Sequence, residues 1–152
     1  MSKHNFIFCP GTWLGLGKLE LTGSPTKIRF YMKWSVLPIE ENVIYCEQLI
    51  ELEEGDEPIL NRFQITITSP NSFDVKLENM TSGIVYGKGA IDGEVISWEY
   101  KEPVFFEDTT GFTGEEVYIL QPNGEYMLRS EYKADGEFKT IIEGRIWKKE
   151  DL

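Results

Sequence analysis

Residues 27–36 read Lys-Ile-Arg-Phe-Tyr-Met-Lys-Trp-Ser-Val, and this stretch decides the fold class. Every second side chain in it is large and apolar, while most of the side chains between them are charged or polar. An alternation with a period of two residues is typical of an antiparallel strand that buries one of its faces. The face predicted to be buried comprises Ile28, Phe30, Met32, Trp34 and Val36.

The same alternation recurs along most of the chain, and turn signals separate the apolar runs. Asp92-Gly93, Asn123-Gly124 and Asp135-Gly136 favour two-residue hairpins, because the type I′ turn needs positive φ angles. No stretch shows a capped helical stripe, and we expect only a short helical turn in the leader before Gly11. The predicted strands lie near 12–22, 27–36, 42–53, 59–68, 72–79, 83–91, 94–101, 115–121, 125–133 and 137–148.

About ten consecutive strands with short connections indicate an up-and-down meander. A twisted sheet of this width tends to close, and closure removes both edges. A length of 152 residues suits one domain. We therefore predict a single all-β domain over residues 1–152, an antiparallel barrel of about ten strands of lipocalin-like type. A two-sheet sandwich is the alternative. A barrel of this size can hold one small ligand.

The charge balance excludes several classes of partner. Fifteen Lys and Arg residues stand against 26 Asp and Glu residues, which gives a net charge of −11. Such a chain is poorly suited to nucleic acids or to anionic membranes, since both require clustered positive charge. The sequence contains one His, His4, so a multi-His metal site and most His-based catalysis are not expected. We expect no metal and no cofactor.

The leader and the cysteines bear on the compartment. The first residues lack an apolar run of signal-peptide length, and nowhere do 18 apolar residues follow one another. Cys9 and Cys46 are too few for a disulfide framework and match no zinc spacing. We expect two reduced, largely buried thiols and a cytoplasmic protein.

The first and last predicted strands carry a family resemblance. Residues 11–17 read Gly-Thr-Trp-Leu-Gly-Leu-Gly. This resembles the Gly-x-Trp start of the calycin superfamily, which includes lipocalins and fatty-acid-binding proteins. The longer form, Gly-x-Trp-x-Gly-x-Gly, resembles the opening of nitrobindin-type barrels. Residues 144–148, Gly-Arg-Ile-Trp-Lys, resemble the closing strand of lipocalins, where a basic residue packs over the opening Trp.

The opening motif has a physical interpretation. The large apolar ring of Trp13 is suited to plug one end of a barrel. Gly15 and Gly17 permit strong bending and a close approach of the backbones. Nitrobindin-type barrels bind haem through a His late in the chain, whereas this sequence has only His4, so it argues against His-ligated haem.

The leading functional hypothesis is non-catalytic binding of a small, hydrophobic or amphipathic molecule inside the barrel. Arg145 is suited either to anchor a ligand carboxylate or to plug the barrel end over Trp13. Tyr132 is a second group that can orient a polar head. The aromatic residues either line a pocket or simply fill the core. The predicted ligand-binding residues are Arg145, Trp147, Tyr132, Tyr126, Trp34, Tyr45, Phe63 and Trp98.

Two alternatives stay open. An isomerase or lyase on the same scaffold needs an inward acid with a shifted pKa close to a Tyr or an Arg. Glu47, Glu99 and Glu143 are the strand-borne candidates. A protein-interaction module would use the acidic stretch 40–57 or the loop containing Phe105-Phe106. We favour binding without catalysis.

Overall fold

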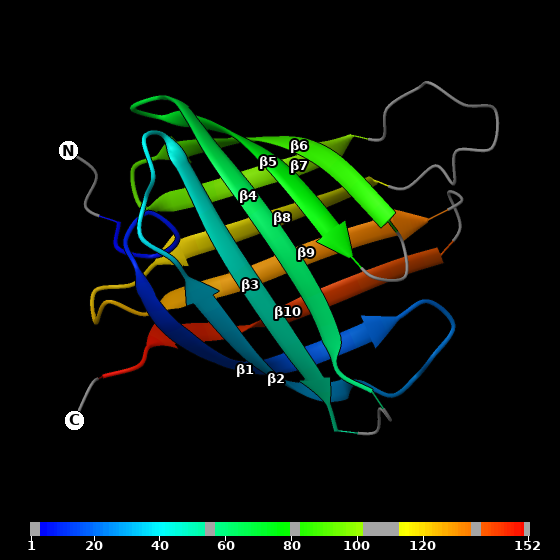
Figure 1. Cartoon of the computed structure of the whole chain (residues 1–152). Helices are drawn as coiled ribbons and strands as arrows, with labels where there is room; N and C mark the ends of the chain where they lie inside the picture. Colours follow the sequence, from blue (N-terminus) through cyan, green and yellow to red (C-terminus); the bar gives the residue numbers. More distant parts are fainter. Residues whose placement is uncertain (1–3, 54–56, 80–82, 102–112, 135–137, 151–152) are drawn as a thin grey trace, which may run out of the picture.

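The chain folds into one closed barrel of ten antiparallel strands, in which each strand pairs with its neighbour in sequence and the last pairs with the first (Figure 1). The computed structural model describes residues 4–53, 57–79, 83–101, 113–134 and 138–150. The all-β barrel prediction is confirmed, and the sandwich is wrong because every strand belongs to a single closed sheet. The strands are β1 Gly11–Leu21, β2 Ile28–Val36, β3 Val43–Leu52, β4 Ile59–Ser69, β5 Ser72–Asn79, β6 Gly83–Asp92, β7 Val95–Lys101, β8 Thr113–Leu120, β9 Tyr126–Ala134 and β10 Phe138–Lys148.

Two of the predicted hairpin turns take other forms. The loop between β6 and β7 contains Gly93 and Glu94, with Asp92 paired to Val95, and only Gly93 has a positive φ. The β8–β9 connection is longer, because Gln121 accepts from the amide of Gly124 and donates its own amide to Glu125. A proline inside that turn and a left-handed glycine after it suit a three-residue loop better than a type I′ pair. Asp135-Gly136 lies outside the described residues.

The leader before β1 folds over one end of the barrel (Figure 1). It contains the expected single turn, in which the amide of Cys9 donates to the carbonyl of Asn5 over 3.2 Å. Phe6 and Ile7 are both 0% exposed, so the leader inserts side chains into the barrel rather than lying on its surface. Trp13 is buried at the same end, with its ring edge-on to Phe6 at 5.4 Å and to Tyr126 at 5.5 Å.

His4 anchors this cap with both of its ring nitrogens. Nδ1 lies 2.7 Å from the hydroxyl of Tyr126, and Nε2 lies 2.8 Å from the carbonyl oxygen of Gly93. A carbonyl can only accept, so Nε2 donates and, in the neutral ring, Nδ1 accepts from the tyrosine. The lone histidine therefore joins the leader to the β6–β7 turn and to β9.

Candidate ligand site in the barrel interior

A carboxylate lies inside the barrel. Glu116 on β8 is 1% exposed. On this strand the inward positions are Gly114, Glu116 and Tyr118, while Glu115 points to solvent. Across the sheet Glu116 is paired with Trp98 of β7 and Ser130 of β9. Three neighbouring strands therefore build its surroundings.

Tyrosine hydroxyls surround this carboxylate. Tyr118 donates to Oε1 over 2.7 Å, and Tyr100 donates a short hydrogen bond to Oε2. Tyr132 also forms a hydrogen bond with Glu116. The indole N–H of Trp98 donates to the hydroxyl of Tyr100 over 2.7 Å, which extends the network by one residue. We call these five residues the Glu116 cluster.

Burial and hydrogen bonding have opposite effects on the pKa of Glu116. Burial raises the pKa of Glu116 above its ordinary 4.5, and the hydrogen bonds from Tyr100, Tyr118 and Tyr132 reduce the rise without cancelling it. Burial, followed by the nearby charge of Glu116, raises the pKa of each of the three tyrosines well above 10. The tyrosines therefore stay protonated at neutral pH and keep their role as donors.

Amide side chains form a polar row on the other side of the interior, on β3, β4 and β5. Asn79 donates to Asn61 over 2.5 Å, and Asn61 donates to Gln48 over 2.8 Å. Gln48 is buried, and its NH₂ group lies 3.6 Å from the sulfur of Met32, a weak acceptor. The row leads from the middle of the barrel to the end of β5, at the barrel end opposite the leader.

The indole N–H of Trp34 completes the polar lining. Trp34 on β2 is 0% exposed, and among the described residues nothing accepts a hydrogen bond from its Nε1. Its ring packs against Phe63 at 4.9 Å and edge-on to Tyr118 at 6.3 Å. It is therefore a buried donor next to the Glu116 cluster with no acceptor from the described part of the chain.

The structure brings five of the eight predicted ligand-binding residues into the interior. Trp34, Phe63 and Trp98 pack on one another, and Tyr132 belongs to the Glu116 cluster. Tyr126 is also buried, but the leader occupies its hydroxyl, and burial raises its pKa to about 12. Its place is in the cap and not at the polar lining.

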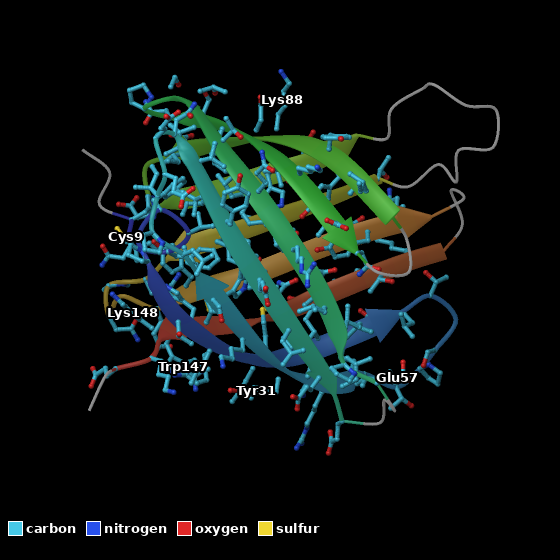
Figure 2. All side chains as sticks on the ribbon, viewed as in Figure 1. Cys9, Tyr31, Glu57, Lys88, Trp147 and Lys148 are labelled. Atoms are coloured by element: carbon cyan, nitrogen blue, oxygen red, sulfur yellow. The ribbon has the colours of Figure 1, made fainter. Side chains whose placement is uncertain are left out.

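The other three predicted residues lie on the outer wall: Arg145, Trp147 and Tyr45. The prediction that they contact a ligand inside the barrel is therefore corrected. Figure 2 shows Trp147 projecting away from the barrel. The side chain of Arg145 is 53% exposed; it binds Glu125 over 2.8 Å and stacks over Trp147 at 4.7 Å. It does not cover Trp13. The reason is strand alternation: Ile142, Gly144 and Ile146 occupy the inward positions of β10.

The glycines of the opening motif lie at the closest approach of the strands. Gly15 and Gly17 face inward and pair with Ile146 and Gly144 of β10. A Cβ at Gly17 would meet the carbonyl oxygen of Glu143 and the ring of Phe30, well inside the 3.0 Å that real Cβ atoms keep. The expectation of close backbone approach agrees with this geometry.

The strand-borne acids predicted for catalysis, Glu47, Glu99 and Glu143, are all exposed on the outer wall. The inward acid with a shifted pKa beside tyrosines is Glu116 instead, and the sequence analysis missed it. One signal was present: Glu115 and Glu116 are adjacent on one strand, so alternation must turn one of them inward. The acidic side chains of the stretch 40–57 are exposed wherever they are described, and Phe105-Phe106 lies outside the described residues.

Other features of the described residues are less suited to a site. Cys9 and Cys46 are both free, as expected, and burial raises the pKa of Cys46 to about 12. A cavity of about 720 Å³ lies beside the leader, between Phe8, Ile67 and Phe73, and its lining includes no Asp, Glu, Lys or Arg side chain. No cluster of metal-ligating side chains and no helix fit to cross a membrane occurs in these ranges.

The raised pKa of Glu116 predicts a stability difference that depends on pH. The folded chain holds the proton of Glu116 more tightly than the unfolded chain, so stability is lost as pH rises from 4.5 through the folded-state pKa. The free energy of unfolding of the wild type, relative to that of a Glu116→Gln variant, should be highest in acid and should fall toward neutral pH. Urea unfolding of both proteins across this range measures the difference; a gap that widens in favour of the wild type as pH rises would contradict it.

Comparison with known proteins gives matches by structure alone. No protein-family model and no curated protein matches the sequence. Rv2717c from M. tuberculosis has 14% identity and a TM-score of 0.64, over 93% of this chain and 92% of that one. The S-type phycobiliprotein lyase CPES from Guillardia theta has 9% identity and a TM-score of 0.66, over 95% and 90%.

A third similar structure is EF1p2_mFAP2b bound to DFHBI, with 11% identity, a TM-score of 0.51 and coverage of 93% of this chain and 94% of that one. Identities this low establish the fold and leave activity open. The chain is similar to barrels that span nearly its whole length, and its closed ten-stranded antiparallel sheet fits a calycin-like fold.

Proposed function

We propose that the protein binds a small, largely apolar molecule inside the barrel, between the Glu116 cluster and the amide row of Gln48, Asn61 and Asn79. Aromatic walls with a few fixed polar groups are the usual lining of small-molecule sites. A solved structure of similar fold holds DFHBI, and another is named as a phycobiliprotein lyase. Both likenesses favour a barrel that takes a ligand.

The observation that carries the proposal is the indole N–H of Trp34, for which no described residue supplies an acceptor. A buried donor without an acceptor costs about 1–3 kcal/mol of stability. Such a group persists where something outside the chain completes it, and a bound molecule with an oxygen or nitrogen acceptor would do so. The molecule would lie against Trp34, Phe63 and Tyr118, whose rings already meet there.

The cap suggests the route of entry. Phe6 and Ile7 fill the leader end of the barrel, and His4 ties the leader to two strands. The polar row from Gln48 to Asn79 leads to the opposite end. We therefore assign entry to the end away from the leader.

We also propose a type of barrel and a cellular location for the protein. A lipocalin-like or nitrobindin-type barrel is supported by the opening motif and by the buried Trp13 at one barrel end. A cytoplasmic location is supported by the two free cysteines, since reduced thiols are the rule in the cytosol.

Two matched variants test where the molecule binds. Ser130 is buried opposite Glu116, whereas its neighbour Arg129 points to solvent. Ser130→Phe puts a ring into the interior, and Arg129→Phe puts the same ring outside. Native mass spectrometry should show a small-molecule adduct on the wild type and on Arg129→Phe, reduced by about tenfold or more on Ser130→Phe. A folded Ser130→Phe protein that keeps the full adduct would place the molecule elsewhere and refute the proposal.

A second candidate is an acid–base enzyme, such as an isomerase or a lyase. The specific observation in its favour is Glu116, an inward acid with a raised pKa among three tyrosines. The molecule found in the adduct distinguishes the two functions. A binding protein releases it chemically unchanged, whereas an enzyme converts it into a product.

A further inference from the structure

The buried carboxylate of Glu116 has no positively charged partner in the described part of the chain, and we infer that the bound molecule supplies one as a protonated nitrogen. This inference rests on the proposed function and narrows its ligand to organic cations with a flat apolar body. The acid is 1% exposed, and the other buried polar or charged residues in the described ranges are His4, Gln48 and Ser130. None of these carries a fixed positive charge.

The nearby basic side chains are engaged elsewhere. Lys133 and Lys139 bind Glu131 on the outer wall, with the Lys139 ammonium 3.0 Å from its carboxylate. Arg129 binds Glu131 and Glu143, also on the outside. Because alternation turns these residues away from the interior, none can neutralise Glu116 without a change of strand register.

The groups around Glu116 are arranged for an anion. Tyr100 and Tyr118 both donate to its oxygens, and neither offers it a charge. Hydroxyl donors favour the ionised form of Glu116 but do not cancel the effect of burial, and a buried ion is compensated far better by an opposite charge. An ammonium or protonated heterocycle next to Glu116 would add that attraction in a medium of low dielectric constant.

The aromatic rings beside the carboxylate favour the same class of ligand. The rings of Trp98 and Tyr118 lie nearly parallel with centroids 5.1 Å apart, and those of Tyr100 and Tyr132 lie nearly parallel at 6.2 Å. The face of such a ring attracts a cation within about 6 Å of its centroid. A carboxylate flanked by four aromatic rings therefore prefers a cation to a neutral molecule, and a neutral molecule to an anion.

Acidic side chains at the barrel end opposite the leader also bear on a cationic ligand. Glu51, Glu53 and Glu57 are exposed around the β3–β4 connection, and Figure 2 shows Glu57 at that end. No ion pair engages these three among the described residues. The opposing charges of the described residues near the same end are Lys27, Arg29, Lys133 and Lys139, of which the last two bind Glu131. With a net charge of −11, the protein as a whole attracts cations to its surface.

Three probes with one ring system test the inference: 2-naphthylmethylamine, 2-naphthylmethanol and 2-naphthoate, measured by calorimetry. The wild type should bind the amine at least about tenfold more tightly than the alcohol, and the naphthoate most weakly. Glu116→Gln should bind the amine and the alcohol alike. Glu115→Gln, which removes the neighbouring carboxylate on the outer wall of β8, is the matched control and should retain the preference.

Each outcome has a distinct meaning. Equal affinity of the wild type for amine and alcohol, with binding lost in Ser130→Phe, overturns the cation inference and leaves the proposed function standing. Binding that survives in Ser130→Phe refutes the proposed function itself. The three-probe comparison on the wild type decides the inference even where Glu116→Gln does not fold.

Discussion

Replacing Phe6 with Ala should lower the free energy of unfolding by about 3–5 kcal/mol, the usual cost of deleting a buried phenyl ring. Phe6 is 0% exposed and inserts its ring from the leader into the barrel. Its ring meets those of Trp13, Trp34, Tyr118 and Tyr126 at centroid distances between 4.8 and 5.4 Å. Its loss would leave a cavity at the centre of the cap, and urea unfolding followed by tryptophan fluorescence measures the cost.

The matched control is Phe8→Ala in the same leader. Phe8 is only partly buried and meets one described ring, that of Phe73, at 5.6 Å. Its removal should cost clearly less than that of Phe6, because fewer contacts are lost. Equal and small losses in the two variants would mean that the leader does not cap the barrel in solution.

Replacing Gly17 with Ala should lower the free energy of unfolding by about 1–3 kcal/mol or more, as overpacking does in a closed core. Gly17 pairs with Gly144 where β1 and β10 close the barrel. The added Cβ would collide with the backbone carbonyl of Glu143 as well as with the ring of Phe30. A side chain can rotate away, whereas the backbone can yield only if the strands separate. Thermal or urea unfolding reports the loss.

Two controls make the result specific. At Gly15 an added Cβ would meet Cγ2 of Ile146 at 2.8 Å and its nearest backbone atom at 3.1 Å, whereas at Gly17 the backbone oxygen of Glu143 lies closer still, so Gly15→Ala should cost less. Leu16→Ala lies between the two glycines on the outer wall and should be close to neutral. A Gly17→Ala protein as stable as the wild type would show that the strands are further apart at this seam.

Much of the fold follows from local pattern. Alternation over residues 27–36 predicted β2, and its apolar face is the one that the barrel buries. The turn residues placed the connections closely enough to give all ten strands. The exact form of the loop after Leu120 was harder, because Pro122 restricts the turn more than the Asn123-Gly124 pair does.

The site was predictable only where one face of a strand is plainly apolar. Trp34 and Phe63 lie on such faces and point inward, as alternation requires. Arg145 was predicted either to anchor a ligand or to plug the barrel end over Trp13, and the alternation of Ile142 and Ile146 places it on the outer wall instead. A period of two is stronger evidence for the direction of a side chain than a short terminal motif, because it follows from strand geometry.

The sequence by itself determined a run of about ten antiparallel strands and the strands, such as β2, that carry one plainly apolar face. Only the tertiary structure decided that Glu116 rather than Glu115 points inward, since Val117 and Ile119 make the outer face of β8 look equally apolar. It also decided that the leader is a cap and that Trp34 lacks an acceptor among the described residues. The physical reason is that alternation separates two faces of a strand, whereas register and closure, set by contacts far apart in sequence, decide which face is inside.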